Sequence, residues 1–301
     1  MSLKDKIEKG GEWHPARMVI YGAPKCGKTS TASDAPNPLF LGQDDGRRRL
    51  SVDGYPIPHT WADFTEQLTE ATKEAKEAGY KSIVIDTLNG VIQLCAEHVC
   101  ETQFGGRWND PRNGFLSWGG AQGWSSVSEE IKPMLNLLNN CVDQGLWVIL
   151  ICHQKIDSVK NPIIGDYQRF APDMDRRVWA RIAQWSDVIL RVDYRIATDK
   201  EGNAINDEER VFNCSASVAE EGGCRIGYEL PEELPFSWQS IEDHIGKTDP
   251  AIFDTLRDLW KSMDKEQTAK AIEYLGVTAK TITDAPAHKI KALINRLQQG
   301  A

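Results

Sequence analysis

The stretch that decides the fold is "MVIYGAPKCGKTSTASDAP", residues 18–36. Apolar residues run into a glycine-containing loop that satisfies the pattern G-x-x-x-x-G-K-[ST] through Gly22, Gly27, Lys28 and Thr29. Glycines let backbone N–H groups curl around phosphates without Cβ clashes, and the following helix points its positive N-terminus at them. The stretch therefore predicts a P-loop between a buried strand (17–21) and a short helix (28–34).

This loop predicts ATP and Mg²⁺ as ligands. Lys28 would reach the β- and γ-phosphates, and the Thr29 hydroxyl would bind Mg²⁺. Asp86 ends the apolar run "SIVID", where a carboxylate can hold the water shell of the metal. We expect the nucleotide to be bound by Gly22, Ala23, Pro24, Lys25, Cys26, Gly27, Lys28, Thr29 and Ser30.

Further elements follow from apolar runs and helical periodicity. Thr60 and Asp63 form a capping-box pattern at the start of an amphipathic helix. Strands that alternate with helices predict a three-layer α/β domain with a mostly parallel sheet. The remaining predicted strands are 38–42, 81–86, 146–152 and 186–195, with more antiparallel strands after them, and the remaining helices are 88–101 and 126–143. We expect two long irregular segments, 102–125 and 154–177.

Polar residues stand directly after two predicted strands. In open parallel sheets, ligands bind beyond the carboxyl ends of the strands. Asp44 or Asp45 could therefore orient the attacking water, although both would also fit a simple acidic turn. His153 could sense the γ-phosphate, or it could be an ordinary polar strand terminus.

The sequence predicts two domains, an ATPase domain of residues 1–245 and a small helical module of residues 246–301. Helix-like segments in this module span 250–263, 265–275 and 285–298. Their apolar faces predict a separate small core. The module could dock a partner, or its basic residues could contact phosphates.

Composition limits the class of protein. The chain has 301 residues and a net charge of -9, which argues against a generic polycation that coats nucleic acid. The N-terminus lacks the apolar region of a secretory signal, and no apolar run approaches the ~20 residues that span a bilayer. The 7 cysteines form no CxxC pair, and Cys214 with Cys224 is a weak disulfide candidate. We expect a cytoplasmic protein without a membrane partner.

The order of these motifs resembles the RecA/KaiC-like branch of P-loop ATPases, which are AAA-type nucleotide-binding proteins. The phrases "APNPLFLGQDDG", "YKSIVIDTLNGV", "LWVILICHQK" and "SDVILRVDYR" are similar to phage-encoded RecA-like ATPases, a group that includes single-strand DNA-annealing recombination proteins. The resemblance covers about residues 16–240. It implies a RecA-like core, a water-positioning acid at Asp44, a sensor at His153 and the cytoplasm of a bacterial host.

The sequence departs from that family in two places. The family usually has Glu where Asp44 stands, so either Asp45 compensates or hydrolysis is slow. A Lys-x-Arg pair is also expected before a late "LP", but "GGCRIGYELP" retains only Arg225. Arg225 is thus the candidate for an arginine finger that acts on a neighbouring subunit of a homo-oligomer.

The two irregular segments lie where RecA-like proteins carry their DNA loops. Aromatic faces can stack on bases while cations hold the backbone phosphates. A packed lid that never touches DNA is the alternative for each segment. The candidate contacts with single-stranded DNA are Arg107, Trp108, Arg112, Lys155, Lys160 and Arg169.

Four functions are compatible with these features. We expect an ATPase that binds single-stranded DNA and promotes annealing or strand exchange, working with a single-strand-binding protein or another replication or recombination protein. A helicase or helicase loader would use the same core. A nucleotide-gated binding protein with little hydrolysis would suit the Asp44 departure. A small-molecule kinase is less favoured, because no arginine-rich lid segment follows the core.

Overall fold

The structure is a computed structural model that describes residues 14–198, 204–226, 230–246, 250–276 and 287–299. The chain divides into two compact units, one of Ala16–Ile241 and one of Glu242–Ala301 together with Met1–Pro15. Helix α7 (Trp238–Ile245) spans this division. The expected domain boundary after residue 245 stays a prediction, and we describe each unit by itself.

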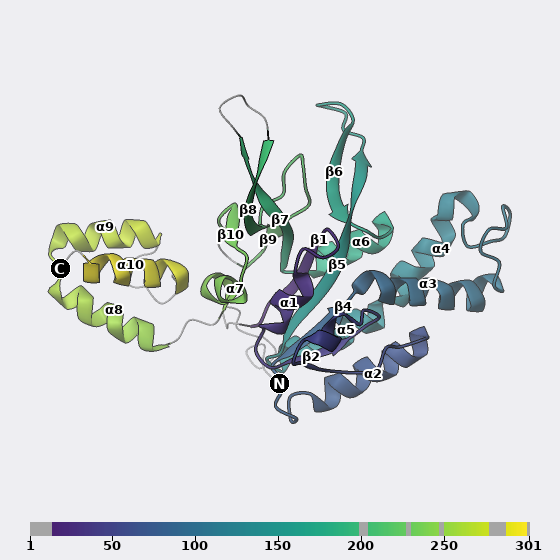
Figure 1. The fold of residues 1–301 in the computed structure, drawn as a ribbon, viewed down its shortest axis with the longest axis horizontal. Coiled ribbons are helices and arrows are strands. Elements are labelled where there is room, and N and C mark those ends of the chain that lie inside the picture. Colours follow the sequence, from purple (N-terminus) through teal and green to yellow (C-terminus); the bar gives the residue numbers. More distant parts are fainter. Residues whose placement is uncertain (1–13, 199–203, 227–229, 247–249, 277–286, 300–301) are drawn as a thin grey trace, which may run out of the picture. The chain divides into compact units, whose positions relative to one another are not determined.

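A mixed sheet forms the centre of the larger unit (Figure 1). Its strand order is β10-β8-β7-β1-β5-β4-β2-β3, with β6 on β5 and β9 on β7. The six strands from β7 to β3 run parallel, whereas β8 is antiparallel to β7. The bounds are β1 Arg17–Gly22, β2 Pro38–Leu41, β3 Asp53–Gly54, β4 Ser82–Asp86, β5 Trp147–Val159, β6 Tyr167–Pro172, β7 Val188–Thr198, β8 Ala204–Asn213, β9 Gly223–Cys224 and β10 Glu233–Pro235.

Burial on both faces explains why the central strands have almost continuous apolar sequences. Every residue of β2 and β4 is buried. In β1, Val19 and Tyr21 belong to the core cluster on one face, and the alternate residues Met18 and Ile20 are also fully buried. The predicted α/β fold with a mostly parallel sheet is confirmed.

Helices cover this sheet and shape the core. Thr60 and Asp63 form the predicted capping box at the start of α2. Apolar residues of α2, α3, α5 and α6 pack with the strand side chains in the core cluster. The bounds are α1 Lys28–Ser33, α2 Trp61–Glu74, α3 Leu88–Phe104, α4 Ser117–Glu130, α5 Lys132–Asp143 and α6 Arg176–Trp185, with a 3₁₀ turn, η2, at Gly46–Arg49.

The expectation of an irregular segment at 154–177 is wrong. β5 does not end near residue 152 but continues to Val159, and β6 pairs with this extension in an antiparallel hairpin. Figure 1 shows the hairpin rising away from the helices. Helix α6 then begins at Arg176, so the segment contains regular structure along most of its length.

The expectation for 102–125 is wrong in part. Helix α3 extends to Phe104, and α4 begins at Ser117 with a kink at residues 118–120. An aromatic cluster orders the remaining loop, because Trp108 stacks on Phe115 with 4.3 Å between ring centroids. Phe115 is fully buried, so this loop is packed rather than free.

The smaller unit contains the three helices that the sequence predicts, α8 (Pro250–Ser262), α9 (Lys265–Leu275) and α10 (Ala287–Gln299). Leu256, Leu275 and Ile290 are among the buried residues of its own core cluster. Asp264 caps α9 with a capping box to Gln267.

The seven cysteines, Cys214 and Cys224 among them, form no disulfide. Within the described ranges, no helix combines the length and the apolar character needed to cross a bilayer.

Gly42 lies where β2 approaches Asp86 too closely for any side chain. Its φ is +118°, and a Cβ there would lie 2.4 Å from the Asp86 carbonyl oxygen. Gly79 also has a positive φ, of +89°, but a Cβ would meet nothing within 4 Å. We expect Gly79→Ala to lower the free energy of unfolding by about 1 kcal/mol and Gly42→Ala by about 2 kcal/mol more. Urea denaturation measures both, and equal losses would contradict the close approach.

Candidate nucleotide-binding site

The P-loop leaves the carboxyl end of β1 and turns directly into α1. Lys25 and Gly27 both have positive φ, at 66° and 98°. Gly22 is also required, because a Cβ on it would lie 2.7 Å from the carbonyl oxygen of Val192 on β7. The loop is therefore curled and held against the neighbouring strand, as a phosphate-binding backbone must be.

Lys28 is a buried cation whose partners are backbone carbonyls. Its side chain is folded back onto the loop, where Nζ donates to Gly22 O at 3.0 Å and to Ala23 O at 2.7 Å. Only 4% of the residue is exposed, and no described carboxylate lies within ion-pair distance of it. A phosphate oxygen would supply the negative charge that this ammonium lacks.

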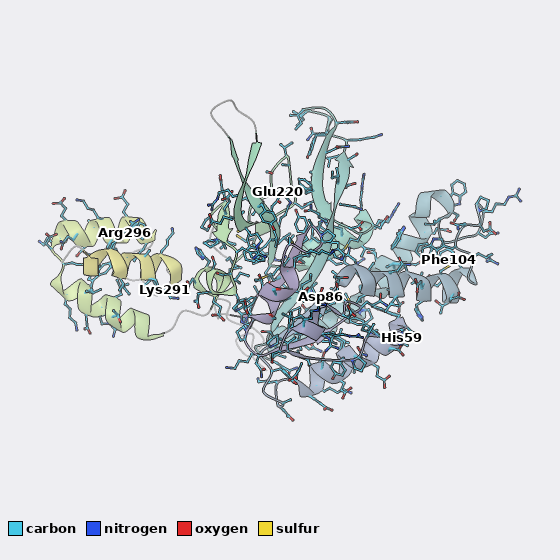
Figure 2. The ribbon with its side chains drawn as sticks, in the orientation of Figure 1. His59, Asp86, Phe104, Glu220, Lys291 and Arg296 are labelled. Carbon is cyan, nitrogen blue, oxygen red and sulfur yellow. The ribbon has the colours of Figure 1, made fainter. Side chains whose placement is uncertain are left out.

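Thr29 and Asp86, the two expected metal ligands, meet at the site. The Thr29 hydroxyl donates to Asp86 Oδ2 at 2.6 Å. The second carboxylate oxygen, Oδ1, is buried and has no hydrogen-bond partner. Burial raises the pKa of Asp86 to about 6 against the opposing hydrogen bond from Thr29. Figure 2 labels Asp86 in the interior of the larger unit.

Asp44 and Asp45 follow β2 but occupy different positions. Asp44 is half-buried and lines the same pocket as Lys28, Thr29 and Asp86, and its Oδ1 accepts a hydrogen bond from Gly46 N at 2.7 Å. Asp45 is exposed and forms a 3.6 Å ion pair with Arg48. Asp44 is therefore the acid that the fold brings to the site, and part of its hydrogen-bonding capacity is used by its own turn.

His153 also lines this pocket, at the point where β5 passes the ends of its neighbours. Its backbone N–H donates to Asn89 Oδ1 at 2.8 Å, and its buried Nδ1 has no partner. Burial, with a further contribution from the Lys28 charge, lowers the pKa of His153. The imidazole is thus neutral near pH 7.

Arg225 lies at the wrong end of the sheet to reach its own P-loop. β9 pairs with the first residues of β7, at the amino ends of the parallel strands. Its guanidinium donates to Trp185 O at 2.7 Å and to Asp187 Oδ1 at 3.2 Å. A finger role toward a second subunit stays a prediction.

The six candidate DNA contacts differ in availability. Arg107, Arg112 and Lys160 are exposed. Trp108 is half-buried against Phe115. Two cations are occupied, because Lys155 Nζ donates to Met174 O at 2.6 Å and Arg169 forms an ion pair with Glu221. The structure therefore leaves Arg107, Arg112 and Lys160 as the cations free to meet a phosphate.

Sequence reasoning missed two residues at the site. Asn89 connects α3 to His153 and, through its amide N–H, to the Asp173 carbonyl. Arg210 reaches the P-loop from β8, where its Nη1 donates to Cys26 O at 3.1 Å. Asn89 stands three residues after Asp86, which is a signal that could have been used, whereas Arg210 is 184 residues from Cys26 and carries none.

These residues fit a magnesium-bound nucleoside triphosphate. The curled loop offers backbone donors, Lys28 offers an unpaired charge, and the orphaned Asp86 Oδ1 offers an acceptor beside the Thr29 hydroxyl. Lys28 would hold phosphate oxygens, and Thr29 and Asp86 would hold the metal, which neutralises phosphate charge when bound. Asp44 and His153 line the same pocket, where the sequence predicts a water-positioning acid and a sensor of the terminal phosphate.

Comparison with known proteins places this geometry in a family. The family described as "AAA domain" matches residues 14–226, which include the P-loop, Asp86, His153 and Arg210. Such a domain implies nucleotide binding and is consistent with ATPase activity. The match ends before the helices α8 to α10.

A phage-related protein is among the relatives. The "SPbeta prophage-derived uncharacterized protein YorG" of Bacillus subtilis (strain 168) is 29% identical over 207 residues. The alignment covers 67% of this chain and 56% of that relative, so the chain matches little more than half of the relative's length.

Two shorter matches carry no functional argument. The 3-isopropylmalate dehydratase large subunits of Haloferax volcanii and Halorubrum lacusprofundi are 32% and 33% identical over 95 residues. In both cases the match covers 28% of this chain and 20% of the relative.

The buried carboxylate of Asp86 should cost stability in the protein free of metal and nucleotide. The folded-state pKa of about 6 lies above the usual value, so the folded protein binds more protons between about pH 4 and pH 6. Stability from this group is therefore present at low pH and lost as the pH rises through about 6. We expect Asp86→Asn to raise the free energy of unfolding at pH 7 by about 2 kcal/mol.

Urea denaturation between pH 4 and pH 7.5 tests this expectation. Asp34→Asn makes the same chemical change on an exposed residue after α1 and should leave stability and its pH dependence unchanged. A stability gain for Asp34→Asn equal to that for Asp86→Asn would show that net charge, rather than burial, is responsible.

Proposed function

Since the chain belongs to the AAA domain family, we propose that it is a magnesium-dependent ATPase that binds single-stranded DNA and promotes annealing or strand exchange. The prophage origin of one relative supports a phage setting within a bacterial cytoplasm. Under this proposal the protein works as a homo-oligomer alongside a single-strand-binding protein or another recombination protein.

The observation that carries the proposal is the path of β5. His153 lies at the nucleotide pocket, and the same strand continues without interruption from His153 to Val159 in the projecting hairpin. Antiparallel pairing continues for five residue pairs beyond Gln154 and Pro172 and holds the hairpin as a ribbon, ending at Val159 and Tyr167. A displacement of His153 by the terminal phosphate would therefore move a rigid element that extends from the sheet.

The hairpin carries exposed apolar and basic side chains that suit an unstacked single strand of DNA. Ile163 is 89% exposed, Ile164 is 61% exposed and Ile156 on β5 is 62% exposed. Exposed apolar side chains of this size usually mark an interaction surface. Lys160 is exposed beside them and would hold a backbone phosphate while the isoleucines contact the faces of bases.

The kinked start of α4 and the loop before it offer a second surface of the same kind. Trp118, in the kink, is 80% exposed and has a φ of 55°, which is unusual for a bulky residue. Strained conformations of this kind cluster at functional sites. Arg107 and Arg112 are exposed on the preceding loop, so an aromatic face for base stacking is accompanied by cations.

A nucleotide-gated binding protein with little hydrolysis is the second candidate. The observation in its favour is Asp44, whose Oδ1 is engaged by Gly46 N and whose side chain is one methylene shorter than the expected Glu. A carboxylate held by its own turn is less able to orient an attacking water. A protein of this kind would use the same ATP site and DNA surfaces but would hydrolyse little ATP.

ATP hydrolysis with and without single-stranded DNA tests the proposal. We expect DNA to stimulate turnover by the full chain, and Lys28→Ala to abolish both the basal and the stimulated rates because it removes the buried phosphate partner. Binding of ATP without turnover would favour the gated binding protein. Translocation-dependent unwinding of a duplex would favour the helicase.

The hairpin can be tested by the salt dependence of DNA binding. Lys160→Ala should reduce the slope of log affinity against log salt by about 0.7, the value for one phosphate contact on a single strand. Lys81→Ala is the matched control, because Lys81 is exposed at the opposite, amino end of β4 and should leave the slope unchanged. Fluorescence anisotropy of a labelled oligonucleotide measures both. Equal slopes for Lys160→Ala and the unmodified protein would exclude the hairpin tip as a phosphate contact.

A further inference from the structure

Arg210 brings a second cation to the P-loop from the flank opposite Asp86. Asp86 and His153 belong to β4 and β5, which lie on one side of β1, whereas β7 and β8 lie on the other. Arg210 extends from β8 across to the loop and donates to the Cys26 carbonyl oxygen. The loop thus has the metal-binding carboxylate on one flank and an arginine on the other.

The guanidinium is held in place before any ligand binds. A Cβ built on Gly27 would lie 2.4 Å from Arg210 Nη1 and 3.2 Å from the ring of Phe236. The guanidinium stacks on that ring at 4.7 Å, and Phe236 in turn packs on the buried Phe212 at 4.9 Å. Stacking orients the plane of the guanidinium and leaves its edge free for hydrogen bonds.

Among the residues whose side chains are described, no carboxylate lies within ion-pair distance of Arg210, although the protein has a net charge of -9. On the adjacent β7, Arg191 pairs with Glu220 at 2.6 Å and Arg195 pairs with Glu233 at 3.1 Å. The bond to Cys26 uses one of the five N–H donors of the guanidinium. Such a group beside a phosphate-binding loop is suited to an anionic ligand.

The position of Arg210 on the β7–β8 side of the P-loop indicates which part of the nucleotide it would contact. Thr29 and Asp86 would hold the metal, which would neutralise charge on the phosphates at the terminal end of the nucleotide, so this end would lie toward β4. The rest of the molecule, which is the α-phosphate and the nucleoside, must then extend toward the other flank. Arg210 and Phe236 occupy that flank.

We propose that Arg210 binds the α-phosphate of the nucleotide and that Phe236 is a positioning residue, which holds the guanidinium against the P-loop at Gly27. This inference rests on the proposed nucleotide-binding function and adds a contact that ADP and ATP share. Phe236 lies beyond residues 14–226, so the chain supplies it from outside the region that matches the family.

Calorimetric titration of the full chain with ADP and with ATP tests the inference. Arg210→Gln should weaken binding of both nucleotides by the same factor, roughly tenfold to a hundredfold for one charge-assisted contact. Arg195→Gln removes an equal charge from β7, where carboxylates already neutralise it, and should leave both affinities unchanged.

Two further measurements separate phosphate binding from mere support of the loop. Glutamine removes both the charge and the terminal nitrogen that contacts Cys26, and only a loss caused by removal of charge should make nucleotide affinity less dependent on salt in Arg210→Gln. Arg210→Lys keeps the charge and should recover part of the affinity. Equal salt dependence of the unmodified protein and Arg210→Gln would assign Arg210 a supporting role and overturn the proposal.

Nucleotide binding by Lys28→Ala distinguishes failure of the Arg210 contact from failure of the proposed nucleotide-binding function. Unchanged nucleotide affinities in Arg210→Gln would overturn the α-phosphate contact. A loss of affinity confined to ATP would also overturn it, because it would place Arg210 at the γ-phosphate. If Lys28→Ala loses nucleotide while Arg210→Gln does not, only this inference fails. If Lys28→Ala also binds both nucleotides normally, the P-loop is not the binding site and the proposed function fails as well.

Discussion

The site depends on a buried charge, the Lys28 ammonium, that has no ion-pair partner among the described residues. Two carbonyl oxygens of the loop hold this ammonium, and carbonyl dipoles offset only part of the cost of removing an ammonium from water. In the same pocket, Asp86 is a buried carboxylate with an orphaned oxygen. The two groups attract each other, but burial still raises the pKa of Asp86, so this attraction does not offset the cost of burying the carboxylate. A magnesium-bound polyphosphate would supply negative charge to Lys28 and positive charge to Asp86, so the pocket is suited to this ligand.

The sequence predicted the parts of the fold that depend on local burial. Strands buried on both faces must be apolar along their length, which is why "SIVID" and "LWVILIC" could be recognised as neighbours in a parallel sheet. Thr60 and Asp63 form a cap within one turn, so that prediction needed no tertiary information. The hairpin was missed because β5 was expected to stop at the pocket, as its neighbours do. Pairing with β6 stabilises the polar half of that strand, and this partner could not be inferred from a buried apolar run.

The same distinction explains which site residues could be predicted. Thr29 follows β1, Asp86 ends β4 and His153 ends the parallel-paired part of β5, and parallel pairing brings these positions together. Arg225 follows an antiparallel pairing, which places it at the amino end of β7. Arg210 also comes from an antiparallel strand, but β8 runs alongside β7 for most of its length and returns its residues to the P-loop. Both strands run antiparallel to β7, so their register along β7, rather than the identity of their residues, decides which arginine meets the nucleotide.

The continuity of β5 sets a limit on how the pocket and the hairpin can influence each other. If nucleotide favours one position of His153 and DNA favours one position of the hairpin, each ligand must change the affinity of the other by the same factor. The free energy for this coupling can come only from contacts that differ between the two positions. His153 has two fixed backbone contacts, with Asn89 and Asp173, and a neutral ring whose Nδ1 lacks a partner. A phosphate that hydrogen-bonds to this ring would therefore act on a group at the base of the hairpin whose hydrogen bonding is incomplete, and a difference between nucleotides would reach the DNA surface through it.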